Sequence, residues 1–95
     1  HFVCENGCYE VNGGHPIPGQ GHLSFADMAK AAGYRSVHEF DELASFEECI
    51  ADILQEEGPV FVDLKVEQGE VYPQDFDRIH GPEMREAFGV ALRAS

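Results

Sequence analysis

The fold is decided near the start of the chain, by the stretch Phe2-Val3-Cys4-Glu5-Asn6-Gly7-Cys8-Tyr9 and its continuation to Pro16. Its first residues are apolar and predict a short strand, which the Asn-Gly pair ends by opening a glycine-rich loop. Such a loop places an amide side chain and bare backbone groups at the carboxyl end of a strand, where open α/β sheets bind ligands. We therefore expect the functional residues in this first loop.

Outward from this stretch, strand-like and helix-like segments alternate along the chain. Two helix starts have the Ser-x-x-acid form of a capping box, at Ser24 and Ser45, and two glycines, Gly33 and Gly58, predict where those helices end. The expected elements are a strand at 1–5, a loop at 6–23, a helix from Ser24 to Gly33, a strand at 34–40, a helix from Ser45 to Gly58, a strand at 60–66, a polar, turn-rich segment at 67–81, and a helix from Pro82 to Leu92.

Strands separated by helices of this length predict a parallel sheet with helices on its faces, so the fold class is α/β. Central strands of such a sheet need cover on both sides, and three strands with three helices make only half of a doubly wound domain. We expect a partial three-layer, parallel-sheet domain, one domain at most in 95 residues. Half a sheet with an open edge is not expected to be stable alone.

Charge and composition exclude some functions and indicate a compartment. The formal net charge is −12, which repels nucleic-acid backbones and anionic membrane surfaces. The acidic residues are densest at 41–48 and 52–57, where they are typical of solvated helix faces. No stretch has the roughly 20 apolar residues of a membrane span, and no signal-peptide pattern is visible. We predict a cytoplasmic protein with no nucleic-acid or membrane partner.

The three cysteines do not form a recognisable disulfide framework. They stand at positions 4, 8 and 49, an odd number in apolar surroundings, so we expect reduced thiols. Cys4 and Cys49 are interpreted as small buried hydrophobes.

Two other interpretations of the first loop remain open at this point. Asn6-Gly7 could be an ordinary hairpin turn, since Asn-Gly is a common hairpin pair. In a different class, four side chains could form a tetrahedral zinc site and make the chain a small metal-stabilised interaction module. Those four are Cys4, Cys8, His15 and His22.

A family resemblance favours a third interpretation. Residues 4–16 resemble the second half of the thiamine-diphosphate motif of 2-oxo-acid decarboxylases, in which an Asn-Gly segment follows a strand. Similarity continues through residues 25–34 and 58–66, and it is greatest to the phosphonopyruvate and sulfopyruvate decarboxylases. Three segments in the right order make the match stronger than a short Asn-Gly match alone.

The resemblance implies a role for each residue of the loop. The Asn6 side chain and the Cys8 backbone carbonyl would be Mg²⁺ ligands, and Gly7 would permit the turn. Tyr9 would lie beside the diphosphate of the cofactor, thiamine diphosphate. His15, which stands where the decarboxylases carry Gln, would contact the substrate.

The resemblance also implies that much of the active site lies elsewhere. The Gly-Asp-Gly half of the motif, with its acidic metal ligand, would precede His1, and the glutamate that activates the cofactor belongs to a pyrimidine-binding domain. We therefore expect residues 1–95 to be the carboxyl-terminal portion of a thiamine-diphosphate-binding domain, inactive alone, from an oligomeric enzyme that decarboxylates a small 2-oxo acid. Glu5 and Asn12 depart from the family pattern, which leaves the substrate open. A non-catalytic subunit domain of the same fold is the alternative.

Overall fold

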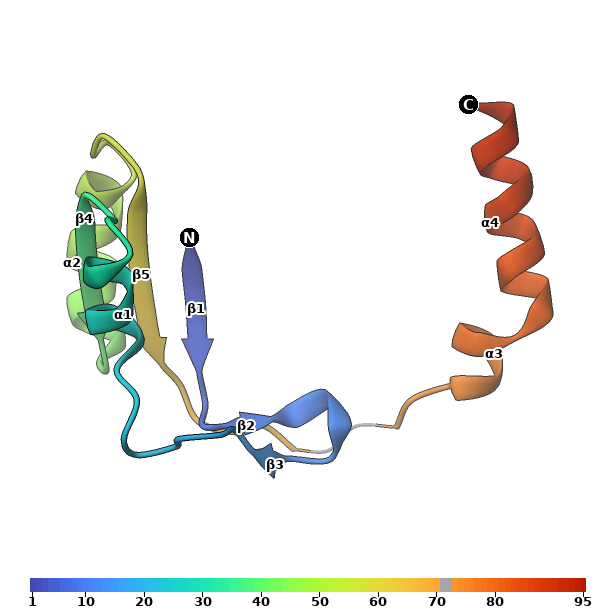
Figure 1. Ribbon diagram of the computed structural model, residues 1–95, viewed down its shortest axis with the longest axis horizontal. Coiled ribbons are helices and arrows are strands. Elements are labelled where there is room, and N and C mark those ends of the chain that lie inside the picture. Colours follow the sequence, from blue (N-terminus) through green and yellow to red (C-terminus); the bar gives the residue numbers. More distant parts are fainter. Residues whose placement is uncertain (71–72) are drawn as a thin grey trace.

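The computed structural model describes residues 1–70 and 73–95 (Figure 1). Within these ranges the chain is α/β. Its elements are β1 (Phe2–Glu5), β2 (Cys8–Tyr9), the 3₁₀ helix η1 (Glu10–Asn12), β3 (His15–Pro16), α1 (Phe25–Ala31), β4 (Ser36–Phe40), α2 (Leu43–Ile53), β5 (Val60–Lys65), α3 (Phe76–His80) and α4 (Pro82–Ala94).

The main sheet has three parallel strands in the order β1-β5-β4, so the last strand in sequence is the central one. Glu5 of β1 pairs with Lys65, and Glu39 of β4 pairs with Asp63. Because all three strands run the same way, their carboxyl ends meet at one edge of the sheet. The loop that follows β1 begins at this edge.

Helices α1 and α2 cover opposite faces of the sheet (Figure 1). Phe40 of β4 meets Phe46 of α2 with ring centroids 5.5 Å apart. On the other face, Phe61 meets Tyr34, which lies just beyond the Gly33 stop of α1, with centroids 5.2 Å apart. Right-handed crossovers explain this placement, because the chain moves one way across the sheet from β1 to β4 and back from β4 to β5.

The core is small. Its buried apolar residues are Ala26 and Ala29 of α1, Ile53 of α2, and Phe61 and Val62 of the central strand. The two alanines allow α1 to approach the sheet closely, and Val62, which is 1% exposed, lies on the opposite face from Phe61. Burial is therefore concentrated around β5.

Both expected ends of the first helix are confirmed. The Ser24 hydroxyl accepts a hydrogen bond from the Asp27 amide at 3.1 Å. At the other end Gly33 has φ +95°, and the Tyr34 amide donates to the Ala29 carbonyl at 3.1 Å. This is the Schellman arrangement that a terminal glycine predicts.

The interpretation of residues 6–23 as an irregular loop was wrong in part. Cys8 pairs with Pro16 and Tyr9 with His15 in a short antiparallel ladder. The chain can reverse between these strands because Gly13 and Gly14 have positive φ. The Asn6-Gly7 pair is no hairpin turn, since it joins β1 to β2, which belong to different sheets.

The second helix begins and ends earlier than its sequence signals suggest. It starts at Leu43, after Glu42, whose side chain makes no capping hydrogen bond. Ser45 lies inside the helix, so its capping pattern was misleading. The helix ends at Ile53, before Gly58, and an acidic, polar stretch then leads to β5.

A short helix, α3, lies within the segment that was expected to be turn-rich. The Asp75 side chain caps it by accepting a hydrogen bond from the Arg78 amide at 3.0 Å. Only five residues follow this cap before Gly81 ends the helix, so its hydrophobic periodicity is too short to recognise.

The prediction that Cys4 and Cys49 are buried was wrong, because both are exposed. Cys4 lies on the edge strand β1, while α2 packs over β4 and leaves the β1 end of that face open. All three cysteines are free thiols in the structure.

The last helix begins with Pro82 in its first turn, as expected, but it buries no residue. Figure 1 shows α3 and α4 standing away from the sheet. The radius of gyration is 18.2 Å, against about 13 Å for a compact domain of 100 residues. The accessible surface is 7512 Å², against roughly 5,400 Å² for a compact monomer of this mass.

None of the helices in the described ranges has the length and apolar content that crossing a bilayer requires.

We predict that Val62→Ala lowers the free energy of unfolding by about 2 kcal/mol, because it removes two buried methyl groups and leaves a void beneath α2. Urea unfolding monitored by circular dichroism measures this. Val11→Ala is the matched control, since Val11 is 64% exposed. Equal losses in the two variants would contradict the placement of the core.

Candidate functional site

The candidate site is the turn Asn6-Gly7-Cys8, at the carboxyl end of β1. Gly7 has φ +74°, and a Cβ at this position would lie 2.5 Å from the Gln20 amide nitrogen. The positive φ therefore favours glycine, whereas the Gln20 side chain could move aside for a Cβ. The Cys8 amide donates to Asn6 Oδ1 at 3.2 Å, so the side chain of Asn6 folds over the turn that follows it.

The orientation of the Asn6 amide is defined by a second hydrogen bond. Its Nδ2 donates to Glu10 Oε2 at 2.8 Å, and Glu10 Oε1 accepts from the Gly69 amide at 2.8 Å. Asn6 Oδ1 accepts only the bond from Cys8 among the hydrogen bonds of this turn, and an amide oxygen has two lone pairs. One lone pair therefore remains for a ligand.

The Cys8 carbonyl is also free of the hairpin ladder. The Gly7 carbonyl accepts from the Ile17 amide at 3.2 Å, so it points toward β3, and the next carbonyl along an extended strand points away. Cys8 lies opposite Pro16, which has no N–H to donate. The turn thus presents two uncharged oxygens, one from a side chain and one from the backbone.

The hairpin brings together the other two residues that the sequence singled out. Tyr9 and His15 are directly opposite each other, so their side chains extend from the same face of the ladder. Both are exposed. The structure therefore places His15 beside Tyr9, immediately after the turn, and leaves both side chains accessible.

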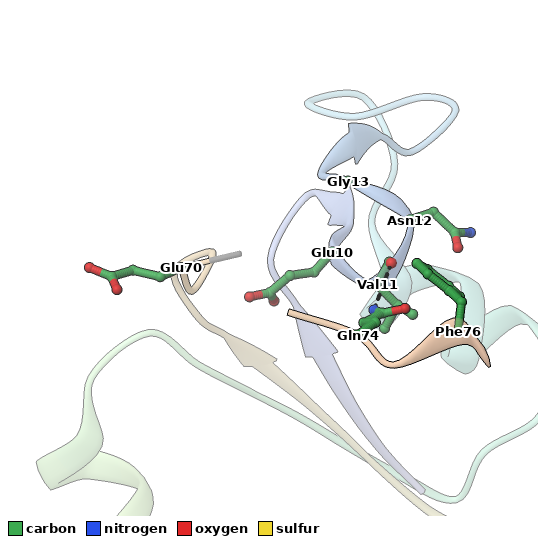
Figure 2. A pocket seen from close by; sticks show the side chains of 7 residues that line it. All are labelled: Glu10, Val11, Asn12, Gly13, Glu70, Gln74 and Phe76. Carbon is green, nitrogen blue, oxygen red and sulfur yellow. Dashed lines mark hydrogen bonds between the residues drawn. The ribbon is translucent and has the colours of Figure 1, made fainter. Parts of the chain in front are cut away.

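Glu10 also lines a cavity of about 430 Å³, whose lining side chains Figure 2 shows. This is within the usual size range of small-molecule pockets. The Gln74 side chain closes one wall by donating to the Val11 carbonyl at 3.1 Å. The lining residues are Glu10, Val11, Asn12, Gly13, Glu70, Gln74 and Phe76.

A charged cluster lies at the same edge of the sheet, where Lys65 meets a carboxylate from each strand. Its Nζ is 3.1 Å from Asp63 Oδ2 and 3.6 Å from Glu39 Oε1, and it also contacts Glu5. Asp63 is fully buried, and its Oδ1 has no hydrogen-bond partner among the described residues. A buried carboxylate with one unpaired oxygen is unfavourable for folding unless another interaction compensates it.

Burial and charge move the pKa values of this cluster in opposite directions. Burial, and then the neighbouring Glu5 carboxylate, raise the pKa of Asp63 above its ordinary value. Burial is the largest influence on Glu5 and opposes its ionisation, but the hydrogen bonds with Lys65 and Asp63 and the charge of Lys65 together outweigh it and lower the pKa of Glu5. Hydrogen bonding to Glu5 raises the pKa of Lys65. Lys65 and Glu5 are therefore the firmly ionised pair.

Ser36, His38 and Glu56 also converge, but not as a nucleophilic triad. The Ser36 hydroxyl donates to Glu56 Oε2 at 2.6 Å, and His38 Nε2 lies 2.9 Å from the same oxygen. In a triad the histidine would stand between the hydroxyl and the carboxylate. Here the hydroxyl bond, and then the histidine, lower the pKa of Glu56. The cluster therefore joins β4 to the segment that follows α2.

The zinc hypothesis does not agree with the structure. Among residues 1–70 and 73–95 no three His, Cys, Asp or Glu side chains lie close enough together to hold a metal ion. Cys4, Cys8, His15 and His22 all fall in these ranges, so the fold does not assemble them as a tetrahedral site.

The donors of the first turn fit a different kind of cation site. Mg²⁺ prefers oxygen ligands and accepts carbonyl and amide oxygens as part of a shell of six. Asn6 Oδ1 and the Cys8 carbonyl supply two such oxygens on one turn, and Gly7 allows the backbone to make it. Thus the residues present fit part of the magnesium and diphosphate site that the family resemblance implies.

No family model, curated protein or solved structure matches this chain.

Sequence reasoning missed Glu10, Asp63 and Lys65. Asp63 was visible as the one acidic residue inside an apolar strand, and Lys65 follows it at the spacing that places both on one face. Glu10 carried no such signal, because its role depends on a contact with Gly69, 59 positions along the chain.

We predict that Asp63→Asn stabilises the protein at pH 7. The folded-state pKa of Asp63 is raised above 3.8, so its ionised form weakens the fold at neutral pH, and this loss fades as pH falls through the folded pKa. The urea midpoint of the variant should exceed that of the wild type at pH 7, and this difference should shrink as pH falls through the folded pKa and disappear below 3.8. Asp52→Asn is the control, because Asp52 is exposed. An equal rise in the urea midpoint of this control would contradict burial of Asp63 as the cause of the stabilisation.

Proposed function

We propose that this chain is the carboxyl-terminal part of the diphosphate-binding domain of a thiamine-diphosphate- and Mg²⁺-dependent enzyme that decarboxylates a small 2-oxo acid. The observation that carries the proposal is the Asn6-Gly7-Cys8 turn at the carboxyl end of β1. It presents two uncharged oxygens at the edge where parallel α/β sheets bind ligands. The similarity of residues 25–34 and 58–66 to the same family supports it.

The charge distribution supports a metal-mediated diphosphate site. Residues 1–29 contain no lysine or arginine, so the first loop cannot neutralise a diphosphate with its own cations. A divalent cation held by uncharged oxygens would supply that charge. The remaining ligands would come from the diphosphate, from water and from an acidic residue outside this chain.

The residues of this chain would bind and orient, while the cofactor, when bound, supplies the electron sink for decarboxylation. Asn6 and Cys8 would hold the cation, and the exposed Tyr9 would lie against the diphosphate. His15, beside Tyr9 on the same face of the hairpin, would contact the substrate.

The proposal implies partners and a compartment. In the family that the chain resembles, the active site forms between this domain and a pyrimidine-binding domain, on the same or another subunit, in a homo- or hetero-oligomer. The large accessible surface and the unburied α4 agree with a chain that packs against further protein. A cytoplasmic location remains a prediction.

A non-catalytic subunit domain of the same fold is the second candidate. The departures at Glu5 and Asn12 leave the substrate of the proposed decarboxylase open, and they do not choose between the two candidates. The two candidates differ in cofactor binding, so one measurement separates them.

We predict that Asn6→Ala in the full-length protein weakens binding of thiamine diphosphate with Mg²⁺ by at least about 100-fold. Removing a residue that only supports a metal ligand can lower metal affinity by about 100-fold. Removing a direct ligand should lower the affinity by at least that much. Isothermal titration calorimetry measures the affinity.

Asn12→Ala is the matched control, since Asn12 lines the neighbouring cavity without belonging to the turn. Its affinity should stay within twofold of the wild type. Unchanged affinity in Asn6→Ala would rule out the assigned ligand, and no binding by the wild type would favour the non-catalytic domain.

A further inference from the structure

Glu10 links three segments that are distant in sequence. It lies on η1, accepts from Asn6 Nδ2 with one oxygen, and accepts from the Gly69 amide with the other, each at 2.8 Å. Asn6 follows β1, and Gly69 follows the central strand β5. Each carboxylate oxygen therefore has its own donor, and the side chain is held from both sides.

The chemistry of an amide makes the first of these bonds important. The two ends of the Asn6 side chain have similar shapes, but only Oδ1 can bind a cation, because Nδ2 is a donor without an acceptor site. A carboxylate accepts hydrogen bonds and cannot donate one when ionised. Glu10 therefore admits only the orientation with Nδ2 toward itself, which leaves Oδ1 facing the turn and the Cys8 amide.

Gly69 keeps Glu10 in this position. A Cβ at residue 69 would lie 2.6 Å from Glu10 Oε1, so a larger residue would displace the carboxylate. The backbone of the same segment is fixed to β1, where the Val66 amide donates to the Glu5 carbonyl at 3.0 Å. The sheet itself thus determines where the carboxylate lies.

We propose that Glu10 is a positioning residue for the cation: it orients the Asn6 amide oxygen toward the metal and adds a nearby negative charge. This rests on the proposed function, since it assigns a supporting role at the same magnesium site. Removing such supporting carboxylates costs about 10- to 100-fold in metal affinity in other metalloproteins. Glu10 would act through Asn6 and would not touch the cofactor.

The test uses Mn²⁺ as the probe, in the full-length protein with thiamine diphosphate, with the affinity measured by electron paramagnetic resonance. Glu10→Gln keeps the size of the side chain but offers a single acceptor oxygen to two N–H donors. It should weaken Mn²⁺ binding by about 10- to 100-fold. Glu10→Asp, which keeps both acceptors, should recover part of that loss.

Two further variants separate positioning from charge and folding. Glu70 lines the same cavity as Glu10. Glu70→Gln removes one negative charge there, as Glu10→Gln does, and should leave the Mn²⁺ affinity within twofold of the wild type. Gly69→Ala keeps every charge but displaces the Glu10 carboxylate, and it should weaken Mn²⁺ binding like Glu10→Gln. If Glu10→Gln fails to fold, Gly69→Ala carries the test.

A second readout needs neither metal nor cofactor. Nuclear magnetic resonance should show the side-chain NH₂ of Asn6 and the amide of Gly69 shifting together in Glu10→Gln and not in Glu70→Gln. Wild-type affinity in both Glu10→Gln and Gly69→Ala would overturn this inference alone. Absence of Mn²⁺ binding by the wild type would overturn the proposed function and this inference with it.

Discussion

The contacts of Lys65 with one carboxylate from each strand are the interaction on which the functional edge depends. Parallel strands bring their carboxyl ends together, and here that places Glu5, Glu39 and Asp63 within reach of one another. Without a cation among them, like charges would repel at the place where β1 and β4 meet the central strand. Lys65 compensates this repulsion, although it leaves one oxygen of the buried Asp63 without a partner among the described residues.

The candidate site follows directly from this edge. Asn6 is the next residue after Glu5, so the position of its turn is set by the pairing of β1 with β5. The segment after β5 then returns to the same place and donates the Gly69 amide to Glu10. Two neighbouring strands thus contribute to one turn, because Asn6 follows β1 and the Gly69 amide that holds Glu10 follows β5.

Local patterns were reliable where a local interaction decides the structure. The Ser24 cap, the Gly33 stop and Pro82 at the start of α4 all depend on residues a few positions apart, and all were found as expected. The Ser45 pattern was misleading because α2 starts one turn earlier. The β2–β3 hairpin was missed because two-residue strands have too little periodicity to detect. Cys4 was misjudged because its exposure depends on which strand α2 covers.

The sequence by itself determined the α/β class, the approximate limits of the main strands and of α1 and α4, and the turn of Asn6 and Gly7. These follow from hydrophobic period, capping and backbone freedom, which act over a few residues. Only the tertiary structure decided that β5 is central, that Asp63 is buried beside Lys65, and that Glu10 holds Asn6. Strand order and the burial of Asp63 are set by which distant surfaces pack together. Glu10 is only four residues from Asn6, but it is held by Gly69, 59 positions along the chain.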